Sequence, residues 1–180
     1  MLDDTMGVLP WFLPGIAVSM AIGLFACRAV GKLLGVRPLL AWTILVAFGV
    51  IVSATLTPLR GELDFAAIAT GTCDLSRVGL ATIARLIQLG DTSLNVALFI
   101  PLGIAIGLVP AFGPRATLIL ASTALPFGIE TIQLLTPILD RGCESADIVD
   151  NLTGLLAGIV VGTALRFIRI RIGARRTIDR

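Results

Sequence analysis

Histidine and tyrosine are both absent from this 180-residue chain, and charged residues make up only 14% of it. Without histidine, the chain has no imidazole to act as a metal ligand or as a general base. Soluble globular domains contain about 25% charged residues, so the low charged fraction argues against a soluble protein. The sequence also has no obvious nucleophile and no phosphate-binding loop of the GxxxxGK[ST] type. These absences count against common hydrolase and kinase chemistry but not against chemistry that needs only carboxylates.

Apolar residues dominate instead, at 56% of the chain. Several apolar runs approach the ~20 residues that a helix needs to cross a bilayer. We therefore predict an all-α fold, a polytopic membrane helix bundle of about five transmembrane helices that forms one domain over residues 1–180. With a net charge of +2 we expect no nucleic-acid partner, and we expect no cofactor. The predicted spans are Leu9–Ala29, Pro38–Thr57, Leu94–Val109, Ala116–Leu135 and Asn151–Ile168.

The basic residues are unevenly divided between the two sides of these spans, and the side richer in them is expected to be cytoplasmic. The richer side carries Arg28, Lys32, Arg37, Arg115, Arg166, Arg169, Arg171, Arg175, Arg176 and Arg180. The opposite side carries only Arg60, Arg77, Arg85 and Arg141. We therefore predict that the amino terminus lies outside and the carboxyl terminus inside. Residues 169–180 would form a basic cytoplasmic tail.

The connection between the second and third spans, about residues 58–92, is a long outer loop. Within it, Leu75–Leu89 has apolar residues near helical spacing, and Ser76 is a candidate cap. We predict a short helix here that lies in the membrane interface or folds back over the bundle.

Two of the three cysteines, Cys73 and Cys143, lie in outer loops. Disulfides persist outside the cytoplasm, so we predict a Cys73–Cys143 bridge that holds the long loop against the loop carrying Arg141. The alternative is a pair of unpaired cysteines that act as small apolar side chains. We expect no metal site, because two thiols without histidine are a poor zinc ligand set.

Glu130 is the most informative residue, because an ionisable group inside a membrane span costs several kcal/mol unless it has a partner. Gln133 follows three residues later and shares its helix face. Arg141, after a short turn, is the expected partner of Glu130 or of an aspartate, because guanidinium grips carboxylate through two parallel bonds. It is also a candidate contact for an anionic ligand.

Further polar residues begin the third and fifth spans. Asn95 stands near the start of the third, and Asp147 and Asn151, four residues apart, enter the fifth. The alternative for Asp147 or Asp150 is helix capping, and for the amides it is hydrogen bonding that only joins helices. We predict that six side chains meet just beneath the outer membrane boundary, namely Asn95, Glu130, Gln133, Arg141, Asp147 and Asn151.

Glycines at steps of four mark two smooth helix faces where another helix can approach closely. One face carries Gly103 and Gly107, and the other carries Gly154, Gly158 and Gly162. We expect these faces to pack within the chain, with dimerisation as the alternative.

Taken in order, the pattern Asn95-x3-Phe99-Ile100-Pro101-Leu102-Gly103, Glu130-x2-Gln133 and Arg141-x5-Asp147-x3-Asn151-x2-Gly154-x3-Gly158 resembles the VanZ-like family of bacterial membrane proteins. The resemblance covers about Thr43–Val161. It implies a multi-pass protein of the bacterial cell membrane with a role in the cell envelope. It also implies a possible link to the glycopeptide teicoplanin, because the founding member is associated with low-level resistance to that antibiotic.

Four functional hypotheses follow. The first is a non-catalytic envelope protein that binds a membrane lipid, a lipid-linked precursor or another anionic ligand at the outward polar residues. The second is a membrane-embedded enzyme acting on such a substrate, with Glu130 as general acid or base and Asp147 as a second carboxylate or cation ligand. The third is a small proton-coupled transporter that uses Glu130 as a relay. The fourth is a purely structural bundle.

Overall fold

The protein is a bundle of helices in a computed structural model, which describes residues 11–58, 72–139 and 141–178. The expected all-α fold is confirmed. Predictions that fall on residues 1–10, 59–71, 140, 179 and 180 lie outside the described residues. In chain order the elements are α2 (Phe12–Leu34), α3 (Pro38–Thr55), α4 (Ile83–Ile87), α5 (Asp91–Gly107), α6 (Phe112–Leu135), the 3-10 helix η1 (Pro137–Leu139) and α7 (Ser145–Ile178).

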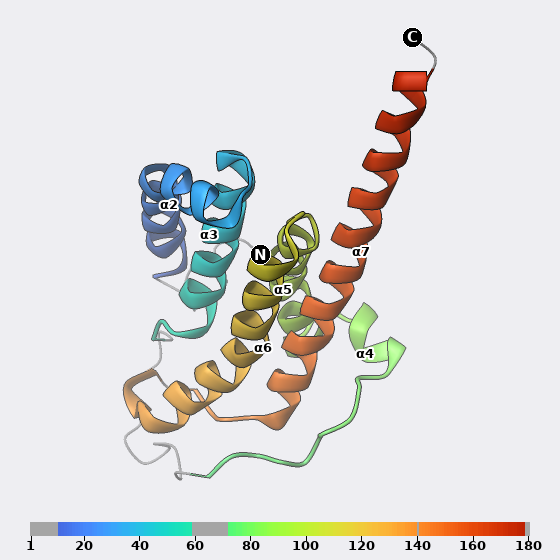
Figure 1. Ribbon diagram of the computed structural model, residues 1–180. Helices are drawn as coiled ribbons and strands as arrows, with labels where there is room; N and C mark the ends of the chain where they lie inside the picture. Colours follow the sequence, from blue (N-terminus) through green and yellow to red (C-terminus); the bar gives the residue numbers. More distant parts are fainter. Residues whose placement is uncertain (1–10, 59–71, 140, 179–180) are drawn as a thin grey trace.

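Four of the described helices are long and apolar enough to cross a membrane: α2, α3, α6 and the Ser145–Ile172 part of α7. The shorter apolar helix α5 has 17 residues. At a rise of 1.5 Å per residue it is ~25 Å long, somewhat less than the ~30 Å hydrocarbon core of a bilayer. The chain is therefore a multi-pass membrane protein. Helix α7 continues through the residues predicted to form a basic tail, and its last turns project beyond the rest of the bundle (Figure 1).

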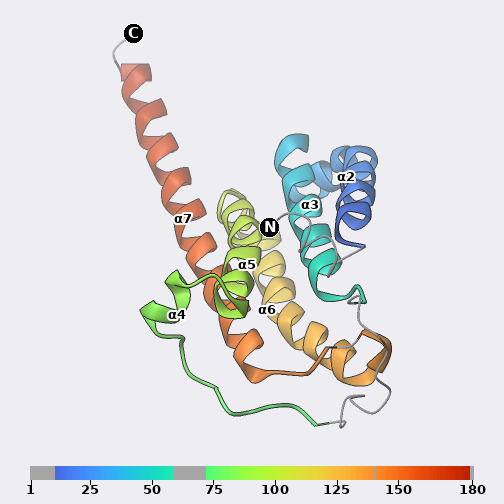
Figure 2. The same cartoon turned by 180° about the vertical axis from the view of Figure 1, so that it is seen from behind.

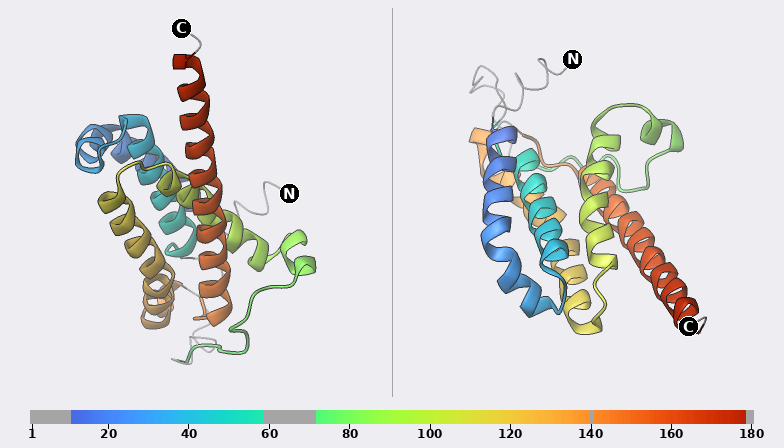
Figure 3. Two further views of the ribbon diagram at one scale, coloured as in Figure 1. Left: turned by 45° about the vertical axis from the view of Figure 1, so that its right-hand side comes forward. Right: turned by 90° about the horizontal axis from the view of Figure 1, so that it is seen from above.

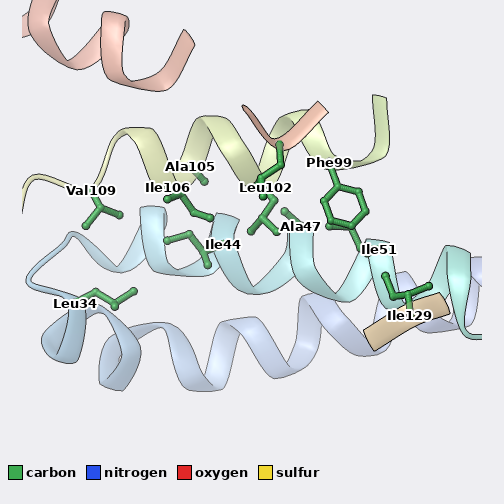
Figure 4. Packing of buried hydrophobic residues seen from close by; sticks show 11 residues of the cluster. Leu34, Ile44, Ala47, Ile51, Phe99, Leu102, Ala105, Ile106, Val109 and Ile129 are labelled. Atoms are coloured by element: carbon green, nitrogen blue, oxygen red, sulfur yellow. The ribbon is translucent and has the colours of Figure 1, made fainter. Parts of the chain in front are cut away.

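The helices pack as two pairs. Helix α2 lies along α3, and α5 lies along α7, as the view from above shows (Figure 3). Contacts between α3 and α5 join the pairs, and α6 packs on α7. The apolar core lies where the pairs meet, with Ile44 and Ile51 of α3 facing Phe99 and Ile106 of α5 (Figure 4). This arrangement places α5 at the centre of the bundle.

Helices α5 and α7 approach so closely that only glycine fits between their backbones. A Cβ atom on Gly158 would overlap the carbonyl oxygen of Ile100 and lie 2.9 Å from the Cα atom of Gly103. Gly154 and Gly162 face the backbones of Val96 and Ile104 in the same way. The two glycine faces expected from the sequence thus lie against each other within one chain.

The helix predicted over Leu75–Leu89 is shorter than expected, because residues 75–82 are not helical and only α4 forms within that segment. The predicted cap, Ser76, instead donates its backbone N–H to the Asp74 carboxylate at 2.7 Å. The side chain that accepts at the start of α4 is Thr82, which accepts from the backbone of Arg85. None of the α4 residues is buried, and α4 lies beside α5 rather than over the bundle (Figure 2).

We predict that Gly158→Ala lowers the free energy of unfolding by about 1–3 kcal/mol, because the added methyl group overpacks the contact between α5 and α7. Gly128 in α6 is the matched control, because a Cβ atom there meets nothing within 4 Å. Gly128→Ala should leave stability unchanged or raise it by up to ~1 kcal/mol, since alanine favours helix. Reversible unfolding in mixed detergent micelles measures both. Equal effects of the two substitutions would contradict the close contact.

Candidate functional site

Helices α3 and α6 end, and α5 and α7 begin, at one end of the bundle (Figure 1). We call the six residues predicted to meet there the polar cluster: Asn95, Glu130, Gln133, Arg141, Asp147 and Asn151. Each of them is buried or half-buried. The interactions described below place Asn95, Glu130, Arg141 and Asp147 near one another, and Gln133 and Asn151 lie on the same helices one turn from Glu130 and Asp147.

Glu130 is buried in α6, with 3% of its surface exposed. Its carboxylate accepts the backbone N–H of Glu144 at 2.8 Å. Charged neighbours surround it, because Asp147 and Glu144 repel the carboxylate and Arg141 attracts it. Glu130 therefore ties α6 to the segment that leads into α7.

Gln133 and Arg141 complete the hydrogen bonding at the end of α3. A helix leaves its last carbonyl groups without intrahelical partners. Gln133 donates its side-chain amide to the Thr55 carbonyl at 3.0 Å, and Arg141 donates to the Ala54 carbonyl at 2.7 Å. The two preceding carbonyls accept from the backbone of Leu56 and the hydroxyl of Thr57. Two predicted site residues thus serve as a carboxyl-terminal cap for a helix about 80 residues earlier in the chain.

The predicted contact between Arg141 and a carboxylate is wrong for the described residues. The guanidinium donates to the Ala54 carbonyl, while Glu130 accepts from a backbone N–H. The reason is that the end of α3 offers an uncapped carbonyl, and the negative end of a helix dipole also attracts a cation. Burial lowers the pKa of Arg141, whereas attraction to Asp147 and Glu130 opposes that effect. The two carboxylates therefore act on Arg141 through their charge and not through a direct bond.

Asn95 and Asp147 meet across the contact between α5 and α7. The Asn95 amide lies near enough to the Asp147 carboxylate to interact with it electrostatically. Asn151, one turn further along α7, is 1% exposed. Helix α7 thus adds a carboxylate and an amide to the same end of the bundle as Glu130.

Within the part of the chain that the structure describes, three buried polar atoms of the cluster have no hydrogen-bond partner: Gln133 Oε1, Arg141 Nε and Asn151 Oδ1. Most buried polar atoms in proteins are paired, and leaving one unpaired costs about 1–3 kcal/mol. Three such atoms, on two helices and the connection between them, offer both acceptors and a donor to a further group. Among the residues that the structure describes, no three His, Cys, Asp or Glu side chains are placed to hold a metal ion.

The predicted disulfide is confirmed. Cys73 and Cys143 are bridged, although they are 70 positions apart in sequence, and their Cα atoms are 4.6 Å apart. Next to the bridge, Asp74 exchanges backbone hydrogen bonds with Cys143 and Ser145 in an isolated parallel bridge. The backbone N–H of Ser76 holds the pKa of the exposed Asp74 carboxylate below its ordinary value. The outer loop is therefore held against the residues that carry Arg141.

Sequence reasoning missed a buried ion pair between Arg77 of the outer loop and Asp150 of α7. The Asp150 side chain is 2% exposed and that of Arg77 is 18% exposed. The hydrogen bond to Asp150 raises the pKa of Arg77. Asp150 lies three residues after Asp147, so helical spacing places it near the polar face of the fifth span. Its residue type, however, also suits a residue that caps the start of a helix. Nothing near Arg77 in the sequence indicates its partner 73 residues away.

We predict that Arg77→Gln lowers the free energy of unfolding by about 3 kcal/mol, because it leaves the Asp150 carboxylate buried without its cation. Arg85 is the matched control, since its side chain is exposed in the same loop. Arg85→Gln should change stability by less than ~0.5 kcal/mol. Unfolding in detergent micelles with the disulfide intact measures both. Similar losses in the two variants would show that the ion pair does not anchor the loop.

The comparisons with known proteins agree with the sequence pattern. A model of the family described as VanZ/LLP1 matches residues 40–166, which is more than half of the chain. No curated protein and no solved structure showed significant similarity. The match contains every residue of the polar cluster and the glycine faces of α5 and α7. On this match, the chain belongs to the VanZ/LLP1 family.

Proposed function

We propose that this protein is a bacterial cell-envelope factor that binds the polar head of a lipid-linked molecule at the polar cluster. The observation that carries the proposal is the set of three unpaired buried atoms, Gln133 Oε1, Arg141 Nε and Asn151 Oδ1. A bundle that used these side chains only to join helices would gain stability by pairing them. Their free hydrogen-bonding capacity supports a bound partner.

The chemistry of the cluster indicates what such a head group would carry. The free oxygens of Gln133 and Asn151 accept hydrogen bonds, so they suit hydroxyl or amide donors on the ligand. The unpaired Nε–H group of Arg141 suits a phosphate or carboxylate oxygen. Glu130 and Asp147 add negative charge, which disfavours a small free anion. A neutral polar head group joined to a lipid through phosphate fits this combination better than a simple anion.

A membrane-embedded enzyme is the second candidate, favoured by one specific observation. The carboxylates of Glu130 and Asp147, from different helices, lie close enough to repel each other beside Arg141. Paired carboxylates in unlike surroundings are the usual arrangement for acid and base catalysis without histidine. Turnover of the bound lipid-linked molecule that depends on both carboxylates would favour this reading over binding alone.

We expect Glu130→Gln to bind at least tenfold more weakly than the wild type to undecaprenyl-diphosphate-linked N-acetylglucosamine in detergent micelles, because an ionised carboxylate accepts hydrogen bonds from the sugar hydroxyl and amide groups more strongly than an amide does. The amide still accepts the Glu144 N–H, so the free energy of unfolding should change by less than about 1 kcal/mol. Glu144→Gln is the matched control, because that carboxylate is exposed in the adjacent segment. Native mass spectrometry measures the bound fraction, and teicoplanin susceptibility provides a cellular readout.

Two results would count against the site. If Glu130→Gln bound the lipid-linked sugar as tightly as the wild type, Glu130 would not belong to the binding site. A Glu130→Leu variant that is at least as stable and equally active would show that the cluster only joins helices.

We propose further that the amino terminus lies outside and the carboxyl terminus in the cytoplasm, following the distribution of basic residues. In intact cells, a membrane-impermeant phosphine should then reduce the Cys73–Cys143 bridge. An impermeant maleimide should label Gly113→Cys, at the opposite end of the bundle, only after permeabilisation, in a Cys27→Ser background. If Gly113→Cys were labelled in intact cells while the disulfide stayed unreduced, the opposite orientation would be indicated.

A further inference from the structure

A second feature lies at the opposite end of the bundle from the polar cluster. There the turn between α2 and α3, the turn between α5 and α6, and the second half of α7 enclose a cavity of about 620 Å³. We call it the basic cavity, because its described lining includes Arg37, Arg166 and Arg169 and no acidic residue. Its volume falls within the ~300–1,000 Å³ typical of small-molecule sites.

Arg166 is held in position within the cavity wall. Its guanidinium donates to the carbonyl groups of Val109 and Pro110, both at 3.2 Å. Its Nε atom is buried and has no hydrogen-bond partner. The side chain is therefore fixed by two backbone acceptors while its Nε–H group stays unused, so little rotamer entropy remains to be lost when an anion binds.

The other two arginines are available for an anion. The guanidinium groups of Arg37 and Arg169 make no hydrogen bond or ion pair to the described residues, and both side chains are exposed. Three cations without a counterion within one cavity favour a ligand that carries a phosphate, since guanidinium matches phosphate geometry.

Apart from Thr43, the rest of the lining is apolar. Leu39, Leu40 and Leu108 line the cavity, and Leu39 is 72% exposed on the outer surface of α3. An apolar wall that continues onto a membrane-facing helix suits an acyl chain better than water. Basic pockets between transmembrane helices are a recurrent way of holding anionic lipid head groups.

We infer that the basic cavity binds an anionic phospholipid of the adjacent leaflet, with the phosphate on Arg166 and the acyl chains along Leu39 and Leu40. This site is separate from the polar cluster and does not rest on the proposed function. Free phosphate shares the head-group chemistry but would leave the apolar wall unused.

The test measures binding of phosphatidylglycerol to the purified full-length protein in zwitterionic detergent micelles by native mass spectrometry. Arg37→Gln and Arg169→Gln should each weaken binding about fivefold, which corresponds to about 1 kcal/mol per basic residue. Arg171→Gln is the matched control, because Arg171 is exposed on α7 and does not line the cavity. It should leave binding unchanged, and phosphatidylcholine should bind weakly to every variant.

Three outcomes would overturn the inference. One is a loss with Arg171→Gln equal to that of the cavity variants, which would indicate diffuse attraction to basic residues. Another is no loss with either cavity variant while their unfolding transitions match the wild type. The third is inorganic phosphate binding as tightly as phosphatidylglycerol, which would assign the cavity to a free anion.

Discussion

The close contact between the backbones of α5 and α7 is the constraint on which the polar end depends. Because Gly103 and Gly158 have no side chains, the two helices run side by side at a distance that other residues would forbid. This contact brings Asn95 of α5 within reach of Asp147 of α7. Dispersion and close packing drive such contacts in a membrane, where burial of apolar surface contributes little between helices. The glycines therefore contribute to both the fold and the candidate site.

The polar cluster combines structural and binding capacity in the same side chains. Gln133 and Arg141 each use one donor to cap α3, and each retains one buried atom without a partner. Capping alone explains why polar residues are present at the end of α3. It does not explain why some of their buried hydrogen-bonding atoms have no partner. Asn151 strengthens the argument, because its buried oxygen is unpaired in a helix whose own backbone needs no cap at that position. These unpaired buried atoms distinguish a candidate ligand site from a set of contacts that only join helices.

Much of the architecture could be predicted because it depends on local pattern. Apolar runs gave the helices, although the starts and ends differ by several residues, and α7 is much longer than its apolar part. The disulfide and the glycine faces also followed from residue type and spacing. Only the second part of the helix expected over residues 75–89 forms, as α4, because long-range contacts override the periodicity of the first part. The disulfide and the Arg77–Asp150 ion pair hold the first part of that segment against α7, which leaves only α4. The predicted partner of Arg141 was wrong for a similar reason, because no sequence pattern shows that α3 ends beside Arg141.

The central claim is that side chains from distant parts of the chain meet at one end of the bundle. Disulfide cross-linking of Asn95→Cys with Asp147→Cys, in a Cys27→Ser background within native membranes, tests it most directly. Thr131→Cys with Asp147→Cys is the control pair, because Thr131 is exposed on α6. We predict efficient cross-linking within one chain for the first pair and none for the control. Absence of a cross-link between positions 95 and 147, or equal cross-linking in the two pairs, would contradict the account.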